Sequence, residues 1–117
     1  MPSPLQQRSY ELIVRAGSLP VKQPLEPRIQ MLLERLFRNA IDLGAELEIA
    51  LGGMDREMFH YHTYELNMLI RQVKLWIRLL DDLGEIEPEV AQPMHSIAEE
   101  VHALILAALR TLKAEKN

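Results

Sequence analysis

Residues 62–84 read HTYELNMLIRQVKLWIRLLDDLG, and this stretch decides the fold. Its apolar residues recur at alternating steps of four and three, a spacing that places side chains on one face of a helix. Asp55 precedes the stretch as a candidate N-cap, and Gly84 follows it as a residue that commonly ends helices. We therefore predict a helix over residues 55–83. Its inward stripe consists of His62, Leu66, Leu69, Val73, Trp76, Leu80 and Leu83.

Prolines and glycines divide the rest of the chain into three further helical segments. A second helix is predicted over 27–51, from Pro27 to the stop at Gly52-Gly53, because proline is tolerated in a first helical turn. A short helix is predicted over 5–16 and a last one over 88–113, and no segment alternates in the manner of a strand. Since short turns favour antiparallel neighbours, we predict a single all-α domain over residues 1–117, an antiparallel up-down four-helix bundle.

Composition excludes several classes of protein. The chain has 117 residues, 48% of them hydrophobic, and no cysteine, so disulfide scaffolds, thiolate metal sites and cysteine nucleophiles are excluded. The longest apolar run, residues 103–109, is far shorter than the roughly 20 residues that span a bilayer. The N-terminus lacks the apolar segment of a signal peptide. We expect a cytoplasmic protein without a membrane segment.

The net charge of −4 is distributed unevenly, with +3 in residues 71–80 and −7 in residues 81–100. Cations gather on helix faces, where a phosphate backbone can bind without base-specific contacts. Antiparallel packing of the second and third helices would bring six of them to one groove or to neighbouring ridges. The other interpretation is an ordinary solvated face. The six candidate binding residues are Arg28, Arg35, Arg38, Arg71, Lys74 and Arg78.

The third and fourth helices carry more apolar surface than the core of one bundle needs. A second stripe on the third helix lies away from its core stripe, and the fourth is apolar nearly all round over residues 101–109. Such a surplus is normally buried, either by another subunit or partner or by the first helix and the chain ends. The candidate oligomer-interface residues are Met68, Leu75, Leu79, Leu106 and Leu109.

Residues 73–84 (VKLWIRLLDDLG) resemble the third-helix signature of the accessory variability determinant (Avd) proteins of diversity-generating retroelements. This family is related to the four-helix-bundle proteins encoded in ribosomal RNA intervening sequences. Residues 19–22 (LPVK) are similar to the connector that follows the family's first helix. The resemblance extends over residues 5–113. It implies a homo-oligomer, typically a pentamer, whose basic surface binds a reverse transcriptase and nucleic acid. It also places Lys74 and Arg78 on the family's basic positions.

Enzymatic alternatives have weaker support. Two Glu-x-x-His pairs, at residues 57–60 and 99–102, have the spacing of metal-ligand motifs, but antiparallel packing would separate them along the bundle, so we expect neither a metal nor a cofactor. Arg56 and His62 match the Arg-x(4–6)-His spacing of HEPN-type ribonucleases, a match that this composition produces by chance. We expect a non-enzymatic protein. A protein-only interaction module without nucleic-acid binding is the alternative.

Overall fold

The residues that the structure describes form four helices, and local sequence signals mark the ends of these helices. The computed structural model describes residues 3–53 and 55–116, with side chains described as far as residue 111. The helices are α1 (Pro4–Gly17), α2 (Pro27–Ala50), α3 (Arg56–Asp82) and α4 (Pro88–Lys116). The predicted ends differ from these by three residues at most.

Capping interactions explain these boundaries. The Asp55 carboxylate accepts the backbone N–H of Met58 at 2.9 Å, which satisfies one of the free donors of the first turn of α3. Ser3 and Gln6 form a reciprocal capping box at the start of α1. At the end of α3, Gly84 has a φ of +72°, and the N–H of Glu85 bonds to the carbonyl of Leu80. This is the Schellman arrangement, which favours glycine in the left-handed position.

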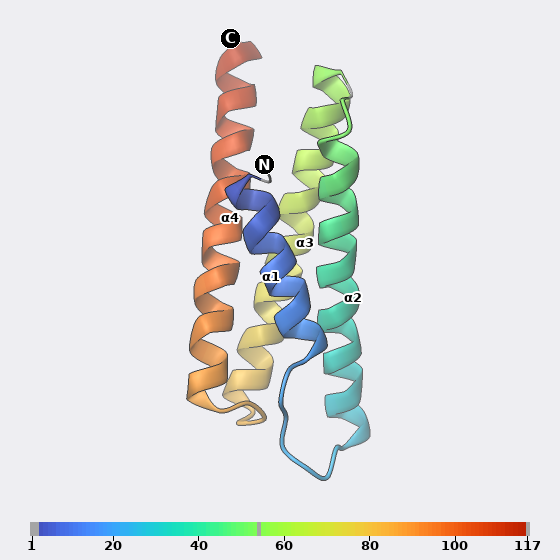
Figure 1. Ribbon diagram of the computed structural model, residues 1–117, viewed down its shortest axis with the longest axis vertical. Helices are drawn as coiled ribbons and strands as arrows, with labels where there is room; N and C mark the ends of the chain where they lie inside the picture. The colour runs from blue at the N-terminus through green and yellow to red at the C-terminus, as the bar shows by residue number, and fades with distance from the viewer. Residues whose placement is uncertain (1–2, 54, 117) are drawn as a thin grey trace.

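The helices alternate in direction around the bundle (Figure 1), and each packs against its two neighbours in the order α1, α2, α3, α4 and back to α1. The predicted antiparallel four-helix bundle is therefore confirmed. It measures 52 × 26 × 20 Å. Because α1 is short, the upper ends of α2, α3 and α4 extend beyond it (Figure 1).

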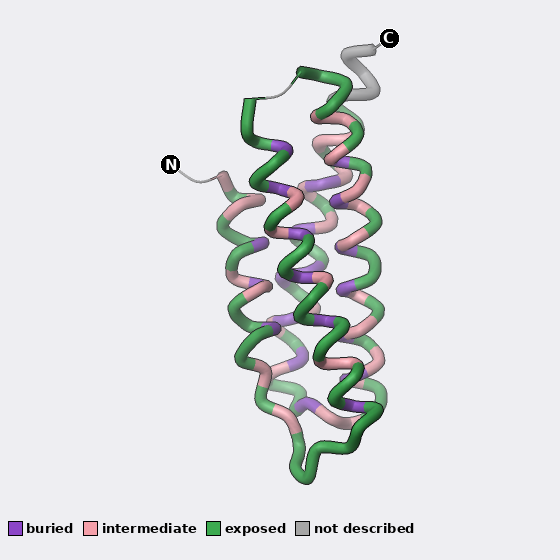
Figure 2. The backbone as a smooth tube through the Cα atoms, turned by 90° about the vertical axis from the view of Figure 1, so that its right-hand side faces the viewer, coloured by how far each residue is buried: buried purple, intermediate pink, exposed green. Residues whose placement is uncertain are grey.

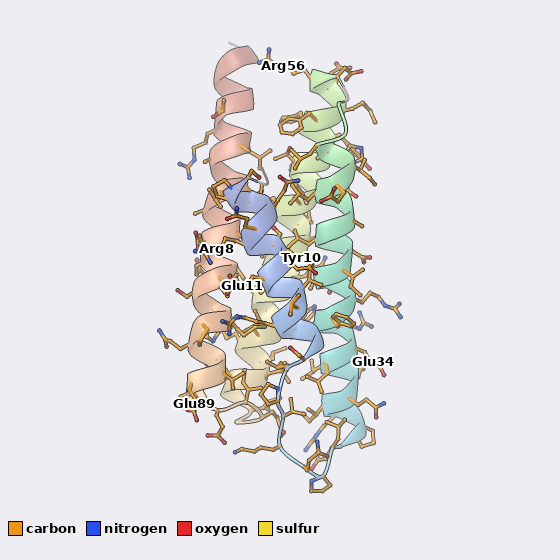
Figure 3. All side chains as sticks on the ribbon, in the orientation of Figure 1. Arg8, Tyr10, Glu11, Glu34, Arg56 and Glu89 are labelled. Carbon is orange, nitrogen blue, oxygen red and sulfur yellow. The ribbon has the colours of Figure 1, made fainter. Side chains whose placement is uncertain are left out.

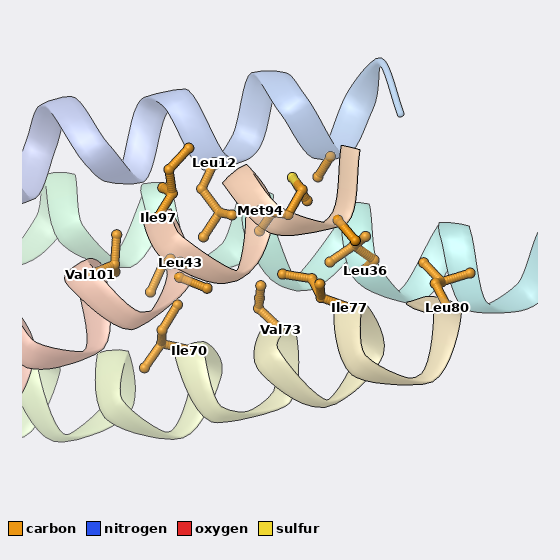
Figure 4. Close-up of a cluster of buried hydrophobic side chains, with 14 of the residues drawn as sticks. Leu12, Leu36, Leu43, Ile70, Val73, Ile77, Leu80, Met94, Ile97 and Val101 are labelled. Carbon is orange, nitrogen blue, oxygen red and sulfur yellow. The ribbon is translucent and has the colours of Figure 1, made fainter. Parts of the chain in front are cut away.

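Buried positions follow the inner face of every helix (Figure 2), and their side chains interlock in one continuous core (Figure 4). Leu12 of α1, Leu36 and Leu43 of α2, and Met94 and Val101 of α4 are among its fully buried members. Burial of this much aliphatic surface is the main force that holds the bundle together.

One part of the predicted core is wrong. The buried stripe of α3 consists of Thr63, Leu66, Ile70, Val73, Ile77 and Leu80. Leu69 and Trp76 are only half-buried, Leu83 is exposed at the helix end, and His62 contacts Glu46 of α2 instead of entering the core. The indole N–H of Trp76 donates to the Asn39 side chain at 2.7 Å, which explains why this ring stays at the edge of the core.

Candidate nucleic-acid interface

Three cations of α3 line a single groove between α3 and α4. Arg71, Lys74 and Arg78 lie at spacings of three and four residues, so they share one edge of the helix. The groove has a volume of about 420 Å³. The other residues that line it are Leu75 of α3 and His95, Ala98, Glu99 and His102 of α4.

Lys74 lies at the centre of a polar network that joins the two helices. Its Nζ lies 2.7 Å from Glu99 Oε1 and 3.0 Å from His102 Nδ1. Because an ammonium only donates, His102 Nδ1 must accept, and we assign the ring proton to Nε2, which donates to Asn67 Oδ1 at 3.1 Å. The neutral form of His102 therefore fits this network, and its protonated form does not.

Electrostatics in the groove agree with that geometry. Partial burial, followed by the charges of Lys74 and Arg71, lowers the pKa of His102 below its ordinary value. The hydrogen bond from Lys74 lowers the pKa of Glu99, which keeps this carboxylate ionised. Glu99 consequently neutralises part of the charge of Lys74 in the unliganded groove.

The two arginines are the available cations of the groove. Arg71 and Arg78 are exposed, and neither forms an ion pair within the part of the chain that the structure describes. A guanidinium group can donate two parallel hydrogen bonds to a phosphate. At the end of the groove nearest Arg78, His95 Nε2 lies 2.9 Å from Asp81 Oδ2.

The candidate cations of α2 lie elsewhere. Arg35 and Arg38 line a second groove, of about 380 Å³, between α2 and α3. Arg28 lies in the first turn of α2, where it pairs with Glu26 at 3.1 Å. Five of the six cations therefore line two neighbouring grooves on either side of α3, and Arg28 lies outside both.

A hydrogen-bonded network forms one wall of this second groove. The Asn39 amide donates to Gln72 Oε1 at 2.8 Å and accepts from the Trp76 indole, so both side chains of α3 are tied to α2. The network and the buried stripe of α3 both place Gln72 and Trp76 on the side of α3 that faces α2. The edge that carries Arg71 and Lys74 therefore faces α4.

The candidate oligomer-interface residues differ in exposure. Met68 and Leu75 lie on the outer face of α3 with exposed fractions of 44% and 39%. Leu79 and Leu106 are half-buried, and Leu109 packs against the core. The first two are therefore the members of the set most available to a partner.

A second apolar surface covers α1 and α2, and the sequence analysis missed it. Tyr10 of α1 is 70% exposed and lies on the side of α1 nearest α2 (Figure 3). An apolar groove of about 390 Å³ runs beside it, lined by Ile13, Ile41 and Leu47 among others. Phe37 and Ile41, four residues apart and off the core stripe of α2, were the signal that could have revealed this surface.

The residues considered for catalysis do not form a common site. Arg56 and His62 are six residues apart, which places them on different faces of α3, and His62 contacts Glu46 of α2. Within residues 3–53 and 55–111, no three histidine, aspartate or glutamate side chains are grouped so that they could hold a metal ion. None of the described helices combines the length and hydrophobicity needed to cross a membrane.

Comparison with known proteins adds no relative. No family model matches the chain, and neither a curated protein nor a solved structure matches it significantly.

Proposed function

We propose that this protein is a non-enzymatic, homo-oligomeric accessory protein that binds nucleic acid through the groove between α3 and α4. By its resemblance to the Avd family, its protein partner would be the reverse transcriptase of a diversity-generating retroelement. The observation that carries the proposal is the row of Arg71, Lys74 and Arg78 along one groove, with both arginines exposed and outside any ion pair among the described residues.

The size of the row fits a phosphate backbone. Arg78 follows Arg71 by seven positions, which corresponds to about 10.5 Å along the helix axis. One strand of duplex DNA carries a phosphate about every 3.4 Å of axis, so this length matches roughly three phosphates. Contacts of this kind give affinity without base specificity, as an accessory protein that handles varied sequences requires.

Acidic residues limit the strength of this binding. Glu99 lies in the groove and pairs with Lys74, and residues 81–100 carry a charge of −7. A phosphate that enters the groove has to compete with Glu99 for Lys74. We therefore expect weak binding that is restricted to this groove and is lost at moderate ionic strength.

Exposed apolar residues support the oligomeric part of the proposal. Met68 and Leu75 are exposed on the outer face of α3, next to the cationic edge, and Tyr10 and Ile41 are exposed on α1 and α2. Apolar patches on a helical bundle commonly mark contact surfaces for other chains. The pentamer favoured by the family resemblance is the state that we expect in solution.

A gel-shift assay at low salt tests nucleic-acid binding. The test variant combines Arg71→Glu, Lys74→Glu and Arg78→Glu, and we expect it to lose the shift that the wild type gives with RNA or DNA. The matched control combines Arg15→Glu, Lys22→Glu and Arg28→Glu, which lowers the net charge equally on surfaces outside this groove. The control should bind as the wild type does. Binding by the test variant at wild-type strength, or no binding by the wild type, would refute the proposal.

A protein-only interaction module is the second candidate, and the apolar surface over α1 and α2 favours it. Under this alternative the wild type forms oligomers in light scattering but does not shift nucleic acid at any salt concentration. A monomer in light scattering contradicts both candidates. The two measurements together therefore separate them.

A further inference from the structure

An aromatic side chain continues the cationic edge of α3. Tyr64, Asn67, Arg71, Lys74 and Arg78 follow one another at steps of three and four, so they occupy the same edge of the helix. Asn67 and Lys74 both bond to His102, which shows that this edge faces α4. Tyr64 lies one turn beyond Asn67, and its side chain is 52% exposed. The row of cations therefore ends at an accessible aromatic ring.

The edge of α4 that faces α3 also changes from charged to apolar residues, at the height of Tyr64. His95, Glu99, His102 and Leu106 also follow at steps of four and three, and the first three line the groove. Leu106 lies about one turn beyond His102, as Tyr64 lies about one turn beyond Asn67. Because the helices are antiparallel and His102 bonds to Asn67, Leu106 and Tyr64 lie at corresponding heights. The two helix edges that border the groove thus pass from charged residues to Tyr64 and Leu106, one turn beyond the residues that line it.

A second exposed tyrosine lies one turn before Tyr64, on the side of α3 nearer α2 and off the edge that carries the cations. Tyr61 precedes Tyr64 by three residues and is also exposed. Its ring packs edge-on against the ring of His62, with centroids 5.2 Å apart and an interplanar angle of 79°. An exposed tyrosine that continues a row of cations, as Tyr64 does, is the combination that single-strand-binding proteins use, in which bases stack on aromatic rings while cations hold the backbone.

We infer that the groove selects single-stranded nucleic acid, RNA or DNA, with its phosphates on Arg71, Lys74 and Arg78 and a base stacked on Tyr64. This inference rests on the function proposed above, because it assigns the form of nucleic acid that the same groove binds. In a duplex the base faces are covered by their neighbours, so a duplex can use the cations but not the ring. Tyr64 therefore contributes to the binding of single strands alone.

Fluorescence anisotropy with a labelled oligonucleotide tests the inference, with the strand as RNA, as DNA and as the corresponding DNA duplex. We expect Tyr64→Ala to weaken the binding of both single strands about tenfold, as the loss of one stacked base does, and to leave duplex binding unchanged. Tyr64→Phe, which keeps the ring, should bind as the wild type does. Leu83→Ala removes an exposed apolar side chain at the opposite end of α3 and is the matched control.

The outcomes separate this inference from the proposed function. If Tyr64→Ala binds single strands as well as Leu83→Ala does, or weakens the binding of duplex and single strands equally, the stacking role is refuted. Binding through the cationic groove is then still supported if the triple variant Arg71→Glu, Lys74→Glu and Arg78→Glu, which reverses the three charges, no longer binds. If Tyr64→Ala alters only oligomer formation in light scattering, the ring contacts protein and the inference is also refuted. Failure of the wild type to bind any probe refutes both proposals.

Discussion

Replacement of Ile77 by alanine tests the rotation of α3, on which the position of the cationic groove depends. Ile77 is fully buried, whereas Leu69 of the same helix is only half-buried. Both substitutions remove three carbon atoms. At about 0.8 kcal/mol for each buried carbon the transfer loss for Ile77→Ala is about 2.4 kcal/mol, and the cavity raises the total to about 3–4 kcal/mol. For Leu69→Ala the partial exposure reduces the expected loss to about 1–1.5 kcal/mol.

Urea denaturation followed by circular dichroism measures both losses. Chains of this size lose about 4 °C in Tm for each kcal/mol, so thermal unfolding should show a decrease of about 12–16 °C for Ile77→Ala and about 4–6 °C for Leu69→Ala. If Leu69→Ala proves the more damaging, α3 has the rotation that its sequence pattern alone predicts. In that case Arg71, Lys74 and Arg78 would not line the groove with α4, and the reasoning about the site would be refuted.

Three further predictions concern packing, capping and pH. A Cβ on Gly44 would lie 2.5 Å from Ile13 Cδ1 but 3.8 Å from its Cγ1. Gly44→Ala should therefore stabilise the Ile13→Val variant by about 1 kcal/mol and the wild type by less, because in the wild type the end of the Ile13 side chain must move aside, as a double-mutant cycle in urea would show. Asp55→Ala should cost about 1 kcal/mol in the same assay, because it removes the cap on Met58, and a loss below the error of the fit would contradict the cap. The pKa of His102 is lowered in the folded chain, so between that value and about 6.5 the unfolded chain binds more protons and the free energy of unfolding falls on acidification. His102→Gln should reduce this fall, and an identical pH profile would contradict the assignment.

Local signals made the positions of the helices predictable, but they did not determine which face of α3 is buried. Pro27, Asp55 and Gly84 act through their own backbone or side chain, so their effects can be read without knowledge of the fold. The stretch 62–84 is apolar over a wide arc and is compatible with two stripes that share Leu66, Val73 and Leu80. Contacts with α2 and α4 decide between them, and the hydrogen bond from Trp76 to Asn39 joins residues 37 positions apart.

The candidate site was likewise predictable only as far as it depends on α3 alone. The spacing of Arg71, Lys74 and Arg78 places them on one edge of a helix, and the structure keeps them together. Which neighbour that edge faces depends on the rotation of α3, a long-range property, so the sequence grouped these residues with the cations of α2. The contact of Lys74 with His102 was missed for the same reason, because the sequence analysis considered His102 only as part of the Glu-x-x-His pair at residues 99–102.

The salt dependence of binding tests the central claim most directly. For single-stranded nucleic acid, the slope of log K against log salt changes by about 0.7 for each phosphate contact. The combined variant Arg71→Gln, Lys74→Gln and Arg78→Gln should therefore have a slope about 2 units shallower than that of the wild type. The control variant Arg15→Gln, Lys22→Gln and Arg28→Gln should keep the wild-type slope. Equal slopes for all three proteins would contradict the claim that the groove between α3 and α4 holds the phosphate backbone.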